Sequence, residues 1–125
     1  MLEQLLELKR RREQRLRQAI VKGKQHDRQL KNHRQALLLE REALQQEWRQ
    51  QGQQGGRLDR QDFYALQRQL EGYFCRDKTL AEEIANIERQ RAEWRDELRD
   101  IQSQLRQTEL EREKLHIMVE QSDAY

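Results

Sequence analysis

Apolar residues recur at alternating steps of three and four along the second half of the chain. Twelve of the sixteen positions in this series are apolar, and the residues between them are almost all charged or amide. The series consists of Leu66, Leu70, Tyr73, Asp77, Leu80, Ile84, Ile87, Arg91, Trp94, Leu98, Ile101, Leu105, Thr108, Arg112, Leu115 and Val119. An alternation sustained over about seven heptads predicts a coiled-coil seam, so this long helix needs a partner helix.

A weaker version of the same spacing predicts a first helix over about residues 2–50. Five of its leucines lie at multiples of seven from one another: Leu2, Leu16, Leu30, Leu37 and Leu44. Four polar or small residues occupy steps where leucine would be expected: Lys9, Arg12, Gly23 and His33. Gly23 costs a helix about 1 kcal/mol relative to alanine. We expect this glycine to make room for a large side chain on the opposite helix.

Residues 51–58 contain three of the five glycines and predict a turn rather than a linker between domains. Gly52 is expected to end the first helix as a left-handed cap. Asp59 is expected to cap the second helix, which we place at about 59–120, with Asp62 at the third helical position. Leu58 and Phe63 would form a hydrophobic staple at its start.

Two long helices joined by a short turn predict one all-α domain over residues 1–125, folded as an antiparallel coiled-coil hairpin. The charge distribution is consistent with this pairing, because the two halves of the chain have opposite net charges. Residues 1–50 carry 13 Lys and Arg against 7 Asp and Glu, a net of +6. Residues 51–125 carry 12 against 16, a net of −4.

A turn centred near residue 54 or 55 sets the predicted register of this hairpin. It would place Leu16 beside Trp94, and the basic run from Lys9 to Arg12 beside the acidic residues between 96 and 100. About a dozen residues of the second helix, among them Leu110, would then project past the first helix.

The composition narrows the possible chemistry. The chain is 38% charged with a net charge of only +2, and it has one cysteine, Cys75. We find no catalytic constellation, no metal-ligand spacing and no cofactor motif, so we expect neither an enzyme nor a metal site. The N-terminal sequence suggests neither a signal peptide nor a membrane span, so we expect a cytoplasmic protein. Nucleic-acid binding is not expected, because acidic residues interrupt the basic run and the second helix would neutralise it.

The Leu- and Arg-rich start LEQLLELKRRREQRLR, the glycine-bearing turn and the ending MVEQSDAY resemble the stalk proteins of type III secretion. This family, called YscO or SctO, is similar to the flagellar export stalk FliJ, and the resemblance covers the whole chain. It implies a monomer at the base of a virulence-associated secretion apparatus. Such a stalk bridges a hexameric secretion ATPase and an export-gate membrane protein, and some relatives escort secretion chaperones.

The resemblance also implies two contact surfaces. The termini surface would meet the ATPase and consists of Leu2, Leu5, Leu6, Leu115, Ile117, Met118 and Val119. The turn surface would meet the export gate and consists of Leu58, Phe63, Tyr64, Leu66 and Leu70. The residues alone leave two other readings open: a dimeric coiled-coil scaffold or adaptor, and a basic binder of nucleic acid or chaperones.

Overall fold

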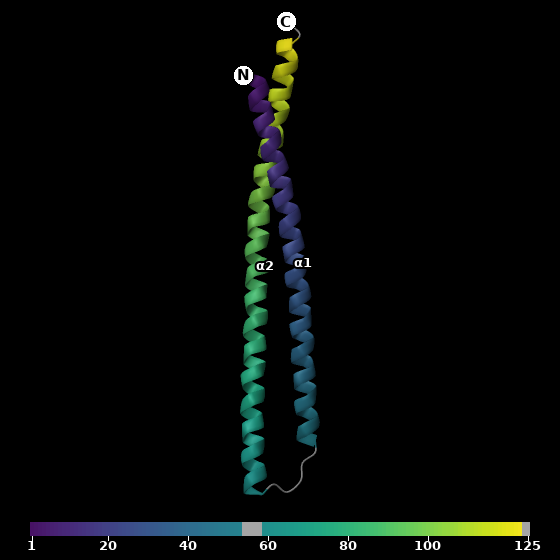
Figure 1. The fold of residues 1–125 in the computed structure, drawn as a ribbon, viewed down its shortest axis with the longest axis vertical. Coiled ribbons are helices and arrows are strands. Elements are labelled where there is room, and N and C mark those ends of the chain that lie inside the picture. Colours follow the sequence, from purple (N-terminus) through teal and green to yellow (C-terminus); the bar gives the residue numbers. More distant parts are fainter. Residues whose placement is uncertain (54–58, 124–125) are drawn as a thin grey trace. The chain divides into compact units, whose positions relative to one another are not determined.

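Two long helices make up the described part of the chain. The computed structural model describes residues 1–53 and 59–123, with helix α1 at Leu2–Gln53 and helix α2 at Arg60–Asp123. The helices pack against each other in antiparallel directions, and the described residues form no strand (Figure 1). The prediction of an all-α antiparallel hairpin is therefore confirmed.

Both helices begin within one residue of the predicted starts, and both end three residues later than predicted, at Gln53 and Asp123. Asp59 caps α2 as expected, because its Oδ1 accepts a hydrogen bond of 2.7 Å from the backbone N–H of Asp62. The cap predicted at Gly52 is wrong, since α1 continues to Gln53 and no described glycine has a positive φ. Glutamine is a good helix former, so the residues around Gly52 favour continuation. The proposed staple involves Leu58, which lies outside the described residues.

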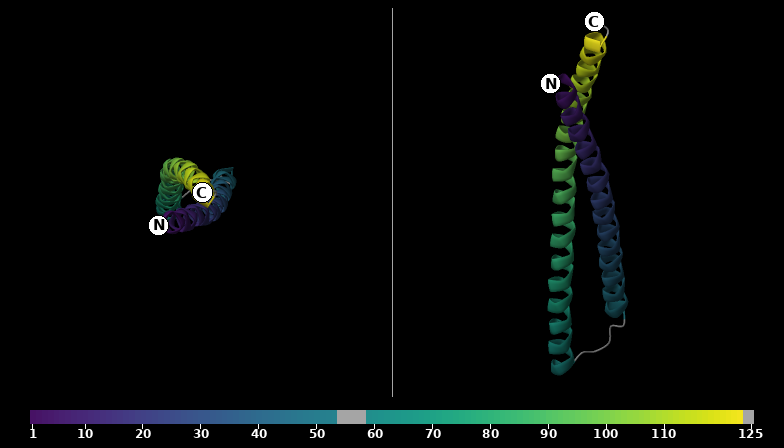
Figure 2. Two further views of the ribbon diagram at one scale, coloured as in Figure 1. Left: turned by 90° about the horizontal axis from the view of Figure 1, so that it is seen from above. Right: turned by 45° about the horizontal axis from the view of Figure 1, so that its top comes forward.

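Contacts between the helices divide the chain into two units, each described here by itself. The first unit contains residues 1–28 and 91–125, and the second contains residues 29–90. The N-terminal segment of α1, drawn in purple, lies beside the C-terminal segment of α2, drawn in yellow (Figure 2).

The first unit has a large side chain packed over a glycine. Gly23 of α1 faces Trp94 of α2, and a Cβ added to Gly23 would lie closer than 3.0 Å to three atoms of the indole ring. The expectation that Gly23 makes room for a large side chain is confirmed. Trp94 itself is half-buried in this position.

The second unit holds the main apolar core. Leu80 is fully buried, and Leu37, Ile84 and Ile87 pack with it. Three partly buried leucines complete the cluster: Leu30, Leu38 and Leu44. Towards the turn, Trp48 stacks on Tyr73 with ring centroids 5.1 Å apart.

The seam predicted for α2 is confirmed at every position. All sixteen residues of the series are buried or half-buried, including its four polar members. On α1 the seam is a strict alternation of fours and threes: Leu2, Leu6, Lys9, Glu13, Leu16, Ile20, Gly23, Asp27, Leu30, Arg34, Leu37, Arg41, Leu44 and Trp48. Arg12 and His33, which we placed on the seam, are exposed. Charged neighbours one residue further on, Glu13 and Arg34, take those steps.

The predicted register is wrong by about one to one and a half heptads. Trp94 lies beside Gly23 rather than Leu16, and Lys9 pairs with Glu111 rather than with the acids between residues 96 and 100. Leu2 consequently shares a surface hollow with Val119, so the projection of a dozen α2 residues past α1 is also wrong. The observed register is set by which polar residues and which glycine of the two seams meet. The prediction from a turn centred near residue 54 or 55 did not consider these positions.

The register leaves the start of α2 without a neighbour on α1. Because Trp48 stacks on Tyr73, Gln53 comes level with roughly residue 68. The first two turns of α2, which carry Phe63 and Tyr64, therefore extend past the last residue of α1 within the second unit.

Candidate functional site

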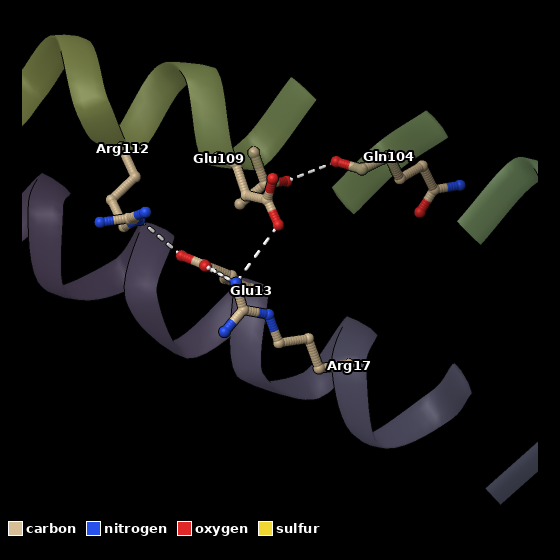
Figure 3. A network of polar contacts seen from close by, with 6 residues as sticks. Glu13, Arg17, Gln104, Glu109 and Arg112 are labelled. Carbon is tan, nitrogen blue, oxygen red and sulfur yellow. Dashed lines mark hydrogen bonds and ion pairs between the residues drawn. The ribbon is translucent and has the colours of Figure 1, made fainter. Parts of the chain in front are cut away.

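A polar layer crosses the seam of the first unit. Glu13 is only 7% exposed, and its carboxylate oxygens lie 2.6 Å from Arg112 Nε and 2.6 Å from Arg17 Nη2 (Figure 3). Arg17 also donates a hydrogen bond of 3.3 Å to Glu109. A nearly buried carboxylate is costly unless it is paired, and two guanidinium groups supply that pairing.

Thr108 lies in the same layer and is 2% exposed. Its hydroxyl donates a hydrogen bond of 2.8 Å to the backbone carbonyl of Gln104, one helical turn earlier. The hydroxyl is thus satisfied within its own helix, which lets a polar side chain occupy a seam position.

Lys9 and Glu111 pair one layer further towards the chain ends, with 2.5 Å between Nζ and Oε2. The hydrogen bond from Lys9, with a second from Gln107, lowers the pKa of Glu111. The carboxylate of Glu111 therefore stays charged to a lower pH than the carboxylate of a free glutamate would.

The seam contains two further buried or half-buried ion pairs. In the first unit, Arg91 donates two hydrogen bonds to the carboxylate of Asp27, at 2.9 and 3.4 Å. In the second unit, Arg41 holds Asp77 in the same two-pronged way, at 2.8 and 3.3 Å. The hydrogen bond from Arg41 lowers the pKa of Asp77 and in turn raises the pKa of Arg41. Such bidentate pairs fix relative position as well as adding energy.

The termini surface separates into packed and exposed members. Leu6 is buried, and Leu2, Leu115 and Val119 are half-buried in the seam. The other predicted members are exposed, Leu5 by 43%, Ile117 by 47% and Met118 by 48%. The exposed three can contact a partner without opening the hairpin.

The turn surface divides in a similar way. Leu66 and Leu70 are half-buried, whereas Phe63 is 56% and Tyr64 is 55% exposed. The two aromatic rings contact each other edge to face, with centroids 6.2 Å apart. Leu58 lies outside the described residues.

Sequence reasoning missed several exposed apolar side chains near these surfaces, among them Phe74 and Leu8. Phe74 is 58% exposed and touches Tyr73 edge to face, beside a cleft of about 240 Å³ lined partly by Trp48 and Gly72. Leu8 is 57% exposed. Both residues lie off the alternation of threes and fours. An apolar residue outside the seam positions is expected to be exposed, so the sequence did contain a signal for them.

Two kinds of feature are absent from the described residues: metal-ligand clusters and membrane-spanning helices. No group of three His, Cys, Asp or Glu side chains among them could hold a metal ion. No helix in the described ranges has a stretch long and apolar enough to cross a membrane.

Comparison of the chain with protein-family models, with curated proteins and with solved structures finds no match.

Proposed function

We propose that the protein is the central stalk of a type III secretion system, located at the base of the secretion apparatus. In this role it bridges the hexameric secretion ATPase and the export-gate membrane protein and supports protein export. It acts through contact alone.

One observation carries the proposal: large apolar side chains remain exposed beside both ends of a hairpin whose own seam is filled. At the chain ends these are Leu5, Ile117 and Met118, and near the turn they are Phe63 and Tyr64. Seam packing does not account for them, and exposed apolar groups of this kind are typical of protein-binding surfaces. A monomeric hairpin has no further use for these groups within its own fold.

The assignment of surfaces to partners follows the resemblance to the stalk family. The exposed members of the termini surface would enter the ATPase ring, and the aromatic pair on the first turns of α2 would meet the gate. Transmission between the partners requires different contacts with different states of the ring, since equal contact with all states shifts no equilibrium.

Point substitutions test this better than truncation, because residues 111, 115 and 119 pack against α1 or pair with it. The doubly substituted variant Ile117→Gln, Met118→Gln should bind a purified secretion ATPase about tenfold more weakly, as expected for loss of two anchor side chains. Leu39→Gln is the matched control, because Leu39 is 56% exposed and belongs to neither surface.

The turn surface has a reciprocal test. Phe63→Ala with Tyr64→Ala should weaken binding to the cytoplasmic part of the export gate and leave ATPase binding unchanged. If neither double variant differs from the Leu39→Gln control, the stalk assignment fails. Light scattering separates the scaffold alternative, since a stalk should remain at its monomer mass of 15.4 kDa as concentration rises.

A further inference from the structure

A small cleft lies between the two helices of the second unit, at the aromatic pair near the turn. Its volume is about 240 Å³. Among its lining residues are Glu47, Trp48 and Gln51 on α1, and Gln69, Gly72 and Tyr73 on α2. Pockets for drug-sized molecules usually exceed about 300 Å³, so this cleft suits a single side chain of a partner protein.

Two aromatic rings line the cleft. Trp48 and Tyr73 stack across the seam with ring centroids 5.1 Å apart and an interplanar angle of 20°. Each side chain is only half-buried, so each retains accessible surface. The faces of such rings carry partial negative charge and attract cations, and the flat guanidinium group of arginine stacks on them best.

The cleft also contains a carboxylate without a cation. Glu47 is the only charged residue in the lining, and it forms no ion pair with the described residues. Arg76, one turn beyond Gly72 on α2, pairs with Glu40 instead. The side chains of Gln51 and Gln69 make no hydrogen bond within the described parts of the chain. A ligand can therefore use the hydrogen-bonding capacity of all three groups.

Gly72 keeps the α2 side of the cleft open. A Cβ added at this position would have nothing within 4 Å. A longer side chain here would lean back along α2 towards Gln69, because helical side chains point towards the N-terminus of their helix. A large residue at position 72 would therefore occupy the cleft.

From these features we propose that the cleft binds an arginine side chain of a partner protein. The guanidinium lies against the accessible surface of Trp48 and Tyr73 and donates hydrogen bonds to the carboxylate of Glu47. An aliphatic side chain would cover that carboxylate without pairing it, and an acidic side chain would meet a like charge. Lysine fits less well, because its compact, strongly hydrated ammonium group presents no flat surface to the rings. The proposal rests on the cleft alone and does not depend on the stalk assignment.

The test compares ligands of similar size and different chemistry on the full chain. The probes are the α-N-acetyl amides of arginine, lysine, leucine and citrulline, the last of which replaces the guanidinium by a neutral urea. Two-dimensional NMR of the isotope-labelled protein follows the indole N–H signal of Trp48, which is assigned by its loss in Trp48→Phe. We expect the arginine amide to bind about tenfold more tightly than the citrulline amide, because only arginine combines an ion pair with a cation–π contact.

Two matched pairs of variants locate the contact. Glu47→Gln should weaken binding of the arginine amide about fivefold. Glu42→Gln, which removes an exposed carboxylate outside the cleft, should change it by less than about twofold. Gly72→Leu should abolish binding by filling the cleft, whereas Gly72→Ala should leave the affinity within about twofold. Circular dichroism checks that the variants keep their helices.

Several results would overturn the proposal. Equal binding of the lysine amide would mean that charge alone suffices, and equal binding of the leucine or citrulline amide would mean that charge is not needed. Equal losses in Glu47→Gln and Glu42→Gln would indicate attraction by overall charge. Undiminished binding to Gly72→Leu would place the ligand outside the cleft. If the arginine amide does not move the Trp48 signal, the cleft is not an arginine site.

Discussion

Replacing Gly23 by alanine should destabilise the first unit, although alanine is the better helix former. On helix propensity alone the substitution would stabilise α1 by about 1 kcal/mol. The new Cβ, however, would overlap the indole of Trp94, approaching three of its atoms to less than 3.0 Å. Overpacking of this kind costs about 1–3 kcal/mol, so the net change should lie between neutral and about 2 kcal/mol of destabilisation.

Gly72→Ala is the matched control on α2. A Cβ at Gly72 has nothing within 4 Å, so this variant should gain the full helix-propensity term of about 1 kcal/mol. Urea unfolding followed by far-ultraviolet circular dichroism measures both variants. The difference in unfolding free energy between the two should be about 1–3 kcal/mol, with Gly23→Ala the less stable.

A double-mutant cycle isolates the cause. In a Trp94→Leu background the space above Gly23 is partly vacant, so Gly23→Ala should become stabilising by about 1 kcal/mol. If Gly23→Ala stabilises the unsubstituted chain as much as Gly72→Ala does, Trp94 does not fill the gap at Gly23. The register described here would then be refuted.

Three further outcomes follow from the seam. Asp27→Arg should destabilise the hairpin by about 2 kcal/mol in urea unfolding, and adding Arg91→Asp should restore most of the loss; no restoration would contradict direct pairing. The pKa of Asp77 is lowered by Arg41, so this pair's stabilisation is fully present above the usual pKa of 3.8 and disappears as pH falls through the lower folded-state pKa. Acid unfolding of Asp77→Asn should accordingly lack part of the pH dependence seen below about pH 4, and identical profiles would count against the pair. Thr108→Val should change stability by less than about 1 kcal/mol, because the hydroxyl bonds only within its helix; a larger loss in thermal unfolding would indicate a partner across the seam.

The fold was predictable because its signal is spread over many residues. The sixteen positions from Leu66 to Val119 repeat one spacing, so a few polar substitutions could not hide the seam. The pairing of Gly23 with a large side chain was also predictable in kind, because Gly23 falls on the seam, where a missing side chain leaves room for one on the opposite helix.

The register was not predictable from the same reasoning. It depends on which polar seam residues meet, and residues such as Glu13 and Arg34 first looked like surface charges beside Arg12 and His33. To place Glu13 rather than Arg12 on the seam, the strict alternation of threes and fours must be continued through positions that carry no apolar side chain. Two exposed side chains near the candidate surfaces, Phe74 and Leu8, were missed although both lie off the alternation of threes and fours.

The ion pairs of the seam also determine which helices can pair with one another. At three levels the two helices present opposite signs: Glu13 with Arg112, Asp27 with Arg91, and Arg41 with Asp77. If two copies aligned identical helices in parallel, each of these residues would instead confront its own duplicate, acid against acid or guanidinium against guanidinium. Like charges held together away from water are strongly disfavoured. Each helix therefore pairs poorly with the same helix of a second copy and well with the other helix of its own chain.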